Sequence, residues 1–268
     1  MTENPICHTR ENGYLNQQQD SRLRGNDKLL YLQAKYGELD ATDLLRVMIE
    51  QEFKGKIAIS SSFGADSALT LALVAEIDPQ TPVLFLETGK HFPETLEYVE
   101  TLKNQLKLSN LQFLTPDPEM LNRIDEKGDL WNSNPTRCCW LRKVEPLDRM
   151  IKELGIEALI TGRKKYQTSD RASLQTIELD EKGLFKINPL ANWSKERQKE
   201  ELKKRNLPQH PLVKDGYLSI GCSPCTTPVK AGEDERAGRW KHTANDGEQK
   251  TECGLHVFSL EENNLRKN

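Results

Sequence analysis

The sequence predicts an α/β fold built on a doubly wound, mostly parallel sheet. Short β-branched and apolar runs alternate with stretches of helical periodicity. Alternation of this kind is typical of parallel sheets that carry helices on both faces. The 268 residues, 36% of them hydrophobic and 29% charged, suffice to bury one main core. We expect a helical N-terminal segment over 1–50, an α/β domain over 51–231, and a flexible C-terminal tail over 232–268 with too few apolar residues to pack.

The expected elements begin with a strand that leads directly into a helix. The first strand, 56–60, is β-branched, and a helical pattern covers 67–76 after a turn of serine and glycine. A further helix begins at Pro93, because proline is tolerated in a first helical turn and Leu96 opens a run of apolar residues at helical spacing. The other expected elements are strands over 83–86, 111–114 and 158–161, a helix over 144–154, paired strands between 174 and 187, and a helix over 194–204 with Ser194 as its N-cap.

The overall charge and hydropathy exclude two broad classes of protein. A net charge of −3 and a pI near 6.0 argue against a nucleic-acid binder, which normally carries a basic face. The N-terminus stays polar, and the longest apolar run, 68–75, is far shorter than the roughly 20 residues that span a bilayer. We therefore expect a cytoplasmic protein without a membrane segment, in which cysteines stay reduced.

Basic residues nevertheless gather near cysteines and turns. Lys164, Lys165 and Lys241 are expected to be solvated surface charges. The arginines beside the cysteine segments suit a small polyanionic ligand better, because a guanidinium group pairs bidentately with phosphate or sulfate oxygens.

The segment Ser62–Ser67, with the sequence SFGADS, lies where the first strand gives way to a helix. Such a loop directs backbone N–H groups and the helix dipole at a bound anion, and Gly64 lets the backbone approach that anion closely. An ordinary strand-to-helix turn capped by Asp66 or Ser67 would explain the same residues. The pattern S-x-G-x-D-S resembles the pyrophosphate-loop family, whose members bind adenine nucleotides at the carboxyl ends of the sheet.

A second loop, 87–91, follows the next strand and is expected to line the same crevice. It is not a Walker A loop, because Gly89-Lys90 lacks both the earlier glycine and the following serine or threonine. Ordinary P-loop hydrolysis is therefore disfavoured.

Four cysteines suit a metal cluster: the adjacent Cys138 and Cys139, and the pair Cys222 and Cys225. Adjacent cysteines rarely close a disulfide with each other, since the small ring strains the bridge. A structural zinc site usually takes a C-x-x-C pair from both segments, whereas an iron–sulfur cube takes four thiolates. The spacing favours a cluster and leaves zinc as the alternative. Cys7 is a spare thiol outside this pattern.

The second half of the chain contains four motifs in a fixed order. They are CCWLRKVEPL from Cys138, C-x-x-C-T from Cys222, R-x-x-R-W from Arg236 and ECGLH from Glu252. Together they resemble the assimilatory adenylylsulfate reductases, the iron–sulfur type of the APS/PAPS reductase family. The likeness runs from about residue 55 to residue 256.

This resemblance implies a [4Fe–4S] cluster on the four cysteines and a nucleophilic Cys253. The reaction implied is the reduction of adenosine 5′-phosphosulfate to sulfite and AMP through an S-sulfonate on Cys253, with thioredoxin or glutaredoxin as electron donor. Lys143, Arg236, Arg239 and His256 would assist the phosphosulfate, and Arg236 and Arg239 have the spacing of one helical face. The oligomeric state stays open, a homo-oligomer included.

The residues expected to bind substrate come from both loops and from the basic segments. The stretch after Gly162 is less rich in arginine than is usual in the family, so which of its arginines touches substrate stays open. The expected residues are Ser61, Ser62, Phe63, Gly64, Asp66, Ser67, Leu86, Thr88, Gly89, Lys143, Arg163, Arg171, Arg236, Arg239 and His256.

Three alternatives remain. The substrate could be the 3′-phosphorylated form, or both forms, although relatives specific for that form usually lack the cysteine quartet. A tRNA-thiolating enzyme of the pyrophosphate-loop type should show a fuller S-G-G-x-D-S loop and a basic extension, and this sequence has neither. A zinc-stapled module without catalysis would make Cys253 dispensable.

Overall fold

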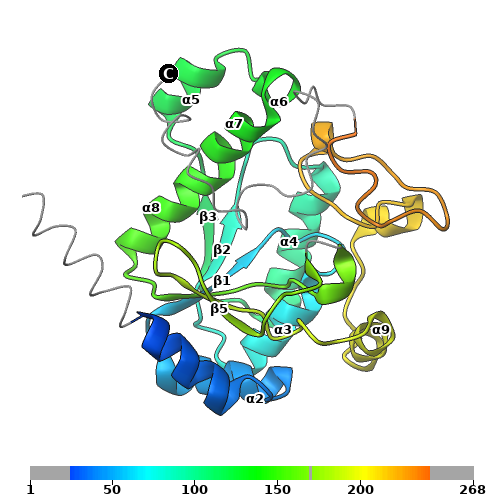
Figure 1. Cartoon of the computed structure of the whole chain (residues 1–268). Helices are drawn as coiled ribbons and strands as arrows, with labels where there is room; N and C mark the ends of the chain where they lie inside the picture. The colour runs from blue at the N-terminus through cyan, green and yellow to red at the C-terminus, as the bar shows by residue number, and fades with distance from the viewer. Residues whose placement is uncertain (1–24, 169–170, 242–268) are drawn as a thin grey trace, which may run out of the picture.

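The computed structural model describes residues 25–168 and 171–241. Six strands in this part of the chain form one sheet in the order β3-β2-β1-β4-β6-β5 (Figure 1). All neighbouring strands pair in parallel except β5 and β6, which are antiparallel. The predicted α/β class is therefore confirmed, and so is the predicted pair of strands between residues 174 and 187. The strands are β1 (Ile57–Ser61), β2 (Val83–Leu86), β3 (Leu111–Leu114), β4 (Ala158–Ile160), β5 (Ile177–Leu179) and β6 (Phe185–Ile187).

The strand order creates a crevice at the carboxyl end of β1. From β1 the chain moves outward to β2 and β3, and it then returns to the other side of β1 to form β4. Ile59 of β1 lies beside Val83 on one side and beside Ile160 on the other. A parallel sheet binds ligands at such a topological switch point, because the connecting loops diverge there.

Helices cover both faces of the sheet (Figure 1). Alternate residues of β1 point to opposite sides: Ile57 and Ile59 belong to a large core, and Ala58 belongs to a smaller one. The large core also contains the helix over 25–36, α2 (Ala41–Val47), α3 (Ser67–Ile77) and α4 (Pro93–Leu106). The smaller core is covered by α8 (Glu145–Glu153).

The cysteine pair 138–139 lies in a longer helix than the sequence predicted. The expected helix over 144–154 is the last part of a continuous run made of α7 (Pro135–Cys139), the π-helical turn η2 (Trp140–Val144) and α8. Pro146 cannot donate a backbone hydrogen bond, and the wider π turn before it accommodates the missing donor. Lys143 lies in this turn.

The shorter helices connect these elements. Ser194 caps α9 (Lys195–Lys204) as predicted, because its Oγ accepts a hydrogen bond from the Arg197 N–H at 3.2 Å. Leu96, the first residue of the apolar pattern in α4, is 41% exposed, whereas Tyr98 is buried in the core. The remaining segments are η1 (Met48–Glu52), α5 (Pro118–Asp125), α6 (Leu130–Ser133), η3 (Lys165–Gln167), α9 (Lys195–Lys204), η5 (Pro211–Asp215) and η6 (Ser223–Cys225).

The last described residues pack against the second cysteine pair. Trp240 is 4% exposed, and its N–H donates to the Cys225 carbonyl at 2.9 Å. Arg239 forms an antiparallel bridge with Thr226. Packing thus continues to Trp240, beyond the predicted start of the tail at 232. Cys253 and His256 lie outside the described residues.

Within the described ranges, each helix is too short or too polar to cross a bilayer.

Candidate active site

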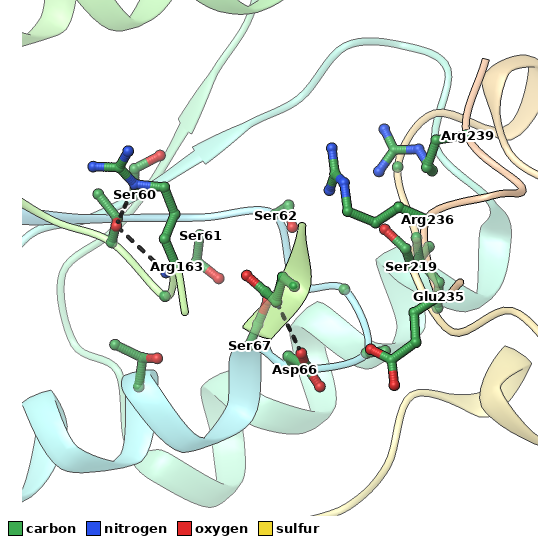
Figure 2. Close-up of a pocket in the computed structure, with 18 of the residues that line it drawn as sticks. Ser60, Ser61, Ser62, Asp66, Ser67, Arg163, Ser219, Glu235, Arg236 and Arg239 are labelled. Atoms are coloured by element: carbon green, nitrogen blue, oxygen red, sulfur yellow. Dashed lines mark hydrogen bonds between the residues drawn. The ribbon is translucent and has the colours of Figure 1, made fainter. Parts of the chain in front are cut away.

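A pocket opens at the switch point of the sheet, over the carboxyl ends of β1, β2 and β4 (Figure 2). Its wall combines the predicted phosphate loop, the loop after β4 and the segment that follows Leu218. Most of the predicted substrate-binding residues lie together in this wall: Ser61, Ser62, Gly64, Asp66, Ser67, Leu86, Lys143, Arg163, Arg171, Arg236 and Arg239.

The phosphate loop is shaped by two tightly constrained residues. Gly64 is needed for close approach, since a Cβ there would lie 3.1 Å from the Ile220 carbonyl oxygen. Phe63 has a φ of 47° and is fully buried, with its ring edge-on to Phe85 at 5.3 Å. Phe63 was expected to touch substrate. The structure corrects this, because its side chain anchors the loop in the core and stands apart from the pocket wall.

Asp66 is the residue before α3, yet in the described structure its carboxylate does not cap this helix. Its Oδ2 instead accepts hydrogen bonds from Lys164 Nζ and Gln167 Nε2, both at 3.2 Å. The Asp66 side chain therefore does not cap α3, and simple helix capping does not explain why this residue is in the loop.

Lys164 was predicted to be a solvated surface charge, and this prediction is wrong. Its side chain is 0% exposed. Burial lowers the pKa of Lys164, and the neighbouring Asp66 carboxylate opposes that shift. Its ammonium group instead reaches the Asp66 carboxylate, 98 positions earlier in the chain.

Cationic side chains stand at both ends of the pocket. Figure 2 shows Arg163 beside Ser60 and Ser61, while Arg236 and Arg239 lie together at the opposite side. Arg163 donates to Glu178 Oε2 at 2.7 Å, and Glu178 also accepts from Asn188 at 2.9 Å. The guanidinium group of Arg163 is therefore held against the strands β5 and β6.

The residues around Arg236 form turns, whereas the spacing of Arg236 and Arg239 suggested one face of a helix. The Arg236 N–H donates to the Asp234 side chain at 2.7 Å, and the Arg239 N–H donates to the Arg236 carbonyl at 2.8 Å. The turn directs both arginines toward the pocket. The sequence therefore placed them side by side, but on a helix that the structure does not contain.

A second, smaller cavity lies beside the pocket and is lined by Cys138, Cys139, Cys222 and Cys225. All four are free thiols. Burial raises the pKa of Cys138 to about 12 and that of Cys225 to about 11. Burial acts in the same direction on Cys222, but Lys143, the Thr88 hydroxyl and Arg239 outweigh it and lower the pKa of this thiol. The neighbouring cations thus stabilise the thiolate form of Cys222 against the effect of burial.

No set of three or more His, Cys, Asp or Glu side chains in the described part of the chain is arranged as a site for a metal ion.

Thr88 and Gly89 were expected in the substrate pocket and instead face the cysteine side. Thr88 Oγ1 lies 3.4 Å from Cys222 Sγ, and its carbonyl accepts from Arg142 Nη1 at 2.7 Å. Gly89 has a φ of +68°, and a Cβ at this position would lie 3.7 Å from the same guanidinium group. The loop after β2 bends toward the helix that carries Cys139, which moves these two residues away from the pocket wall.

A buried ion pair that the sequence did not reveal supports this loop. Arg142 Nη2 lies 2.6 Å from Asp125 Oδ2, and both side chains are buried. Asp125 Oδ1 also accepts the Leu130 N–H at 2.9 Å. Other polar wall residues missed from the sequence include Gln167, Ser219 and Glu235. Glu235 directly precedes Arg236 of the R-x-x-R-W motif, so its position next to a motif could have indicated it. Gln167 belongs to no motif.

The pocket and the cysteine cavity share part of their walls. Lys143, Arg239 and Trp240 line both of them. The protein is thus an α/β protein of the adenine-nucleotide pyrophosphate-loop type, with a cationic pocket that adjoins four cysteines.

Comparison with known proteins narrows this class. The phosphoadenosine phosphosulfate reductase domain matches residues 56–228. Adenosine 5′-phosphosulfate reductase of Mesorhizobium japonicum is 46% identical over 86% of this chain and 87% of its own. Adenosine 5′-phosphosulfate reductase 2 of Bacillus subtilis is 38% identical over 81% of this chain and 90% of its own. The chain belongs to the phosphoadenosine phosphosulfate reductase family.

A solved structure agrees with the fold. Phosphoadenylyl-sulfate reductase from Candida auris, in complex with phosphate, superimposes with a TM-score of 0.64 and 28% sequence identity. The match covers 75% of this chain and 96% of that one.

Proposed function

We propose that the protein reduces adenosine 5′-phosphosulfate to sulfite and AMP in assimilatory sulfate reduction. The observation that carries the proposal is the shared wall, since Lys143, Arg239 and Trp240 join an anion pocket to a cavity of four cysteines. The relatives from M. japonicum and B. subtilis, both named adenosine 5′-phosphosulfate reductases, support it.

The pocket would bind the substrate by its charges. The loop 62–67 offers backbone N–H groups at the start of α3, and Arg236 stands beside Arg239, which also lines the cysteine cavity. The phosphosulfate is a multiple anion, and cations placed around its leaving oxygen stabilise the charge that develops in the transition state. We therefore expect the sulfur end near Lys143 and Arg239, with the adenosine toward Arg163.

A [4Fe–4S] cluster would be held by Cys138, Cys139, Cys222 and Cys225. A cube takes its ligands at separate corners, so its cysteines surround a volume rather than one ion, and these four line one cavity. Arg142, Lys143 and Arg239 in the same wall would offset the negative charge of four thiolates. When bound, the cluster would supply an electrostatic field at the reacting end of the pocket.

The reaction proposed begins with the Cys253 thiolate, which attacks the sulfur of the substrate. A new S–S bond forms, the S–O bond to AMP breaks, and AMP leaves with the electron pair of that bond. Lys143, Arg236, Arg239 and His256 would neutralise the approaching anions. The product on the protein is an S-sulfonate.

A dithiol partner would then release sulfite. One thiolate of thioredoxin or glutaredoxin attacks the Cys253 sulfur, sulfite leaves, and a mixed disulfide forms. The second partner thiol resolves this disulfide, so the partner is oxidised by two electrons and Cys253 is restored. The thiol chemistry fits a cytoplasmic location, where such donors are kept reduced.

Anaerobic purification followed by a visible spectrum, iron analysis and intact mass after incubation with adenosine 5′-phosphosulfate tests the proposal. We expect a brown protein that gains a sulfonate on Cys253. Cys253→Ser should keep the colour and lose the adduct, whereas the control Cys7→Ser should keep both. Cys225→Ser should lose iron and activity together. A colourless zinc protein without an adduct would contradict the reductase assignment.

The 3′-phosphorylated substrate is the second candidate, because the C. auris structure carries that substrate in its name. Comparing kcat/KM for the two nucleotides decides between them. The four cysteines favour the unphosphorylated form, so we expect the higher value for adenosine 5′-phosphosulfate.

A further inference from the structure

A carboxylate in the wall of an anion pocket needs an explanation. Asp66 belongs to the phosphate loop and lines the pocket, and its side chain is 34% exposed. An uncompensated carboxylate at this place would repel the phosphate and sulfate groups of the ligand. In other sites that bind phosphate beside a carboxylate, a divalent cation such as Mg²⁺ commonly offsets the two charges.

Lys164 lies directly behind this carboxylate. Its Nζ is 3.2 Å from Asp66 Oδ2, and no part of its side chain reaches solvent. Lysine is almost never fully buried unless it is paired, because an isolated buried ammonium group loses its hydration. The lysine is therefore placed where its charge acts on Asp66 from the protein side and leaves the pocket side open.

Gln167 connects this pair to a second cation of the wall. Its Nε2 donates to the same Asp66 oxygen at 3.2 Å, and its Oε1 accepts the Lys164 backbone N–H at 3.1 Å. The Arg171 guanidinium group also donates to Gln167 Oε1. Loop, buried lysine and wall arginine thus form one hydrogen-bonded unit, and Figure 2 shows Asp66 and Ser67 in the middle of the pocket.

We propose that Lys164 is the built-in counter-ion of the phosphate loop and makes anion binding in this pocket independent of a divalent metal. It is a positioning residue: it acts through Asp66, which it neutralises and orients. The identity of the full substrate rests on the proposed function, but AMP, which carries the adenosine and one phosphate group, suffices as a probe of the pocket.

Calorimetric titration of the full-length protein with AMP, with 5 mM EDTA or roughly 5 mM Mg²⁺ present, tests this role. For the wild type we expect the same Kd in both buffers. Lys164→Met should raise the Kd in EDTA about tenfold or more, because the carboxylate is left facing an anion. Mg²⁺ should recover part of that loss by binding between Asp66 and the phosphate. Lys165→Met, one residue on and absent from the pocket wall, is the matched control and should bind as the wild type does.

The double variant separates charge compensation from simple packing. If Lys164 acts by neutralising Asp66, then Asp66→Asn should bind AMP as tightly as the wild type or more tightly. Adding Asp66→Asn to Lys164→Met should recover at least half of the lost binding free energy. With substrate, Lys164→Met should raise KM and leave kcat nearly unchanged.

Several outcomes would overturn the proposal. One is a double variant that binds as weakly as Lys164→Met alone; another is a wild type that gains tenfold in affinity from Mg²⁺. If Lys164→Met fails to fold, the Asp66→Asn titration still decides, since a tenfold loss there contradicts charge compensation. A wild type that binds AMP but does not turn over adenosine 5′-phosphosulfate would count against the proposed function and leave this inference standing.

Discussion

Two ion pairs near the active site differ in how much of each pair is exposed to the pocket. In the pair beside the cysteines, the Arg142 and Asp125 side chains are 6% and 1% exposed. In the pair behind the phosphate loop, Lys164 is 0% exposed and Asp66 is 34% exposed. The first pair is closed within the protein, whereas the second presents one partner to the pocket.

The chemistry of the cations matches this difference. Arg142 uses its planar group to donate to Asp125 through Nε and Nη2 and to the Thr88 carbonyl through Nη1. It therefore fixes the geometry of a helix and a loop at once. Lys164 is a compact charge whose ammonium group lies against the Asp66 carboxylate, which suits charge compensation better than fixing the geometry of two segments. The role of a buried ion pair can therefore be inferred only after the exposed fractions of its two partners are compared.

The largest effect is expected from breaking the closed pair. Asp125→Ala leaves the Arg142 charge buried without its carboxylate, and we expect the free energy of unfolding to fall by about 3–5 kcal/mol. Urea denaturation measures this loss. Asp66→Asn keeps a hydrogen-bond acceptor for Lys164 and is solvated on one side, so its loss should be smaller. Equal losses would mean that the two pairs do not differ in the way described.

A buried histidine that the fold keeps neutral contrasts with the two charged pairs. His210 is 1% exposed; its Nδ1 accepts the Leu212 N–H at 3.2 Å, so its Nε2–H is left to donate to Thr95 Oγ1 at 3.0 Å. Burial lowers the pKa of His210 to about 4 from an unfolded value of 6.5. The protonated form is thus favoured in the unfolded chain, and stability is full above pH 6.5.

We therefore expect the free energy of unfolding to fall by about 2–3 kcal/mol as the pH drops from 6.5 to 4 through this group. Chemical denaturation at several pH values measures the slope. His210→Gln should flatten this part of the profile, and an unchanged slope in that variant would assign the acid sensitivity to other residues.

A neutral buried hydrogen bond should matter less than either ion pair. The Tyr98 hydroxyl donates to the Pro208 carbonyl at 2.7 Å and joins α4 to the segment that leads to the second cysteine pair. Tyr98→Phe should cost about 1 kcal/mol, by the usual net value of one hydrogen bond. A change in thermal midpoint of only a few degrees is expected, and a loss as large as that of Asp125→Ala would contradict this ranking.

The smallest effect is expected at an exposed pair. Lys56 Nζ lies 2.5 Å from Glu157 Oε1, with the two side chains 57% and 47% exposed. Lys56→Met should change stability by less than about 0.5 kcal/mol, because solvent screens the charges. A clear drop in the urea midpoint would show that exposure does not predict the importance of pairs in this protein.

The strands and the phosphate loop could be predicted because their signals are local. The β-branched run before Ser61 and the apolar run 83–86 can be recognised without knowing any neighbour, and parallel pairing then brings their loops together. Gly64 could be recognised from its place in this loop, although the group that it approaches, the Ile220 carbonyl, belongs to a distant segment of the chain.

The missed features depend on contacts between distant segments. Asp66 and Lys164 are 98 positions apart, and nothing in the local sequence distinguishes the buried Lys164 from its half-buried neighbour Lys165. Asp125 precedes Arg142 by 17 positions across two short helices, so no helical spacing links them. The positions of Thr88 and Gly89 likewise depended on how a loop bends toward a helix that it meets only in the folded protein.

Trp240 has a consequence for kinetics. Its side chain is buried in the walls of both cavities, and Cys253 follows Lys241 by twelve residues in the sequence. A chain of that length reaches at most about 40 Å from its point of attachment. A tether of this length corresponds to a local concentration in the millimolar range. In the proposed reaction, the encounter between the Cys253 thiol and the bound nucleotide would then be unimolecular, with a rate independent of protein concentration.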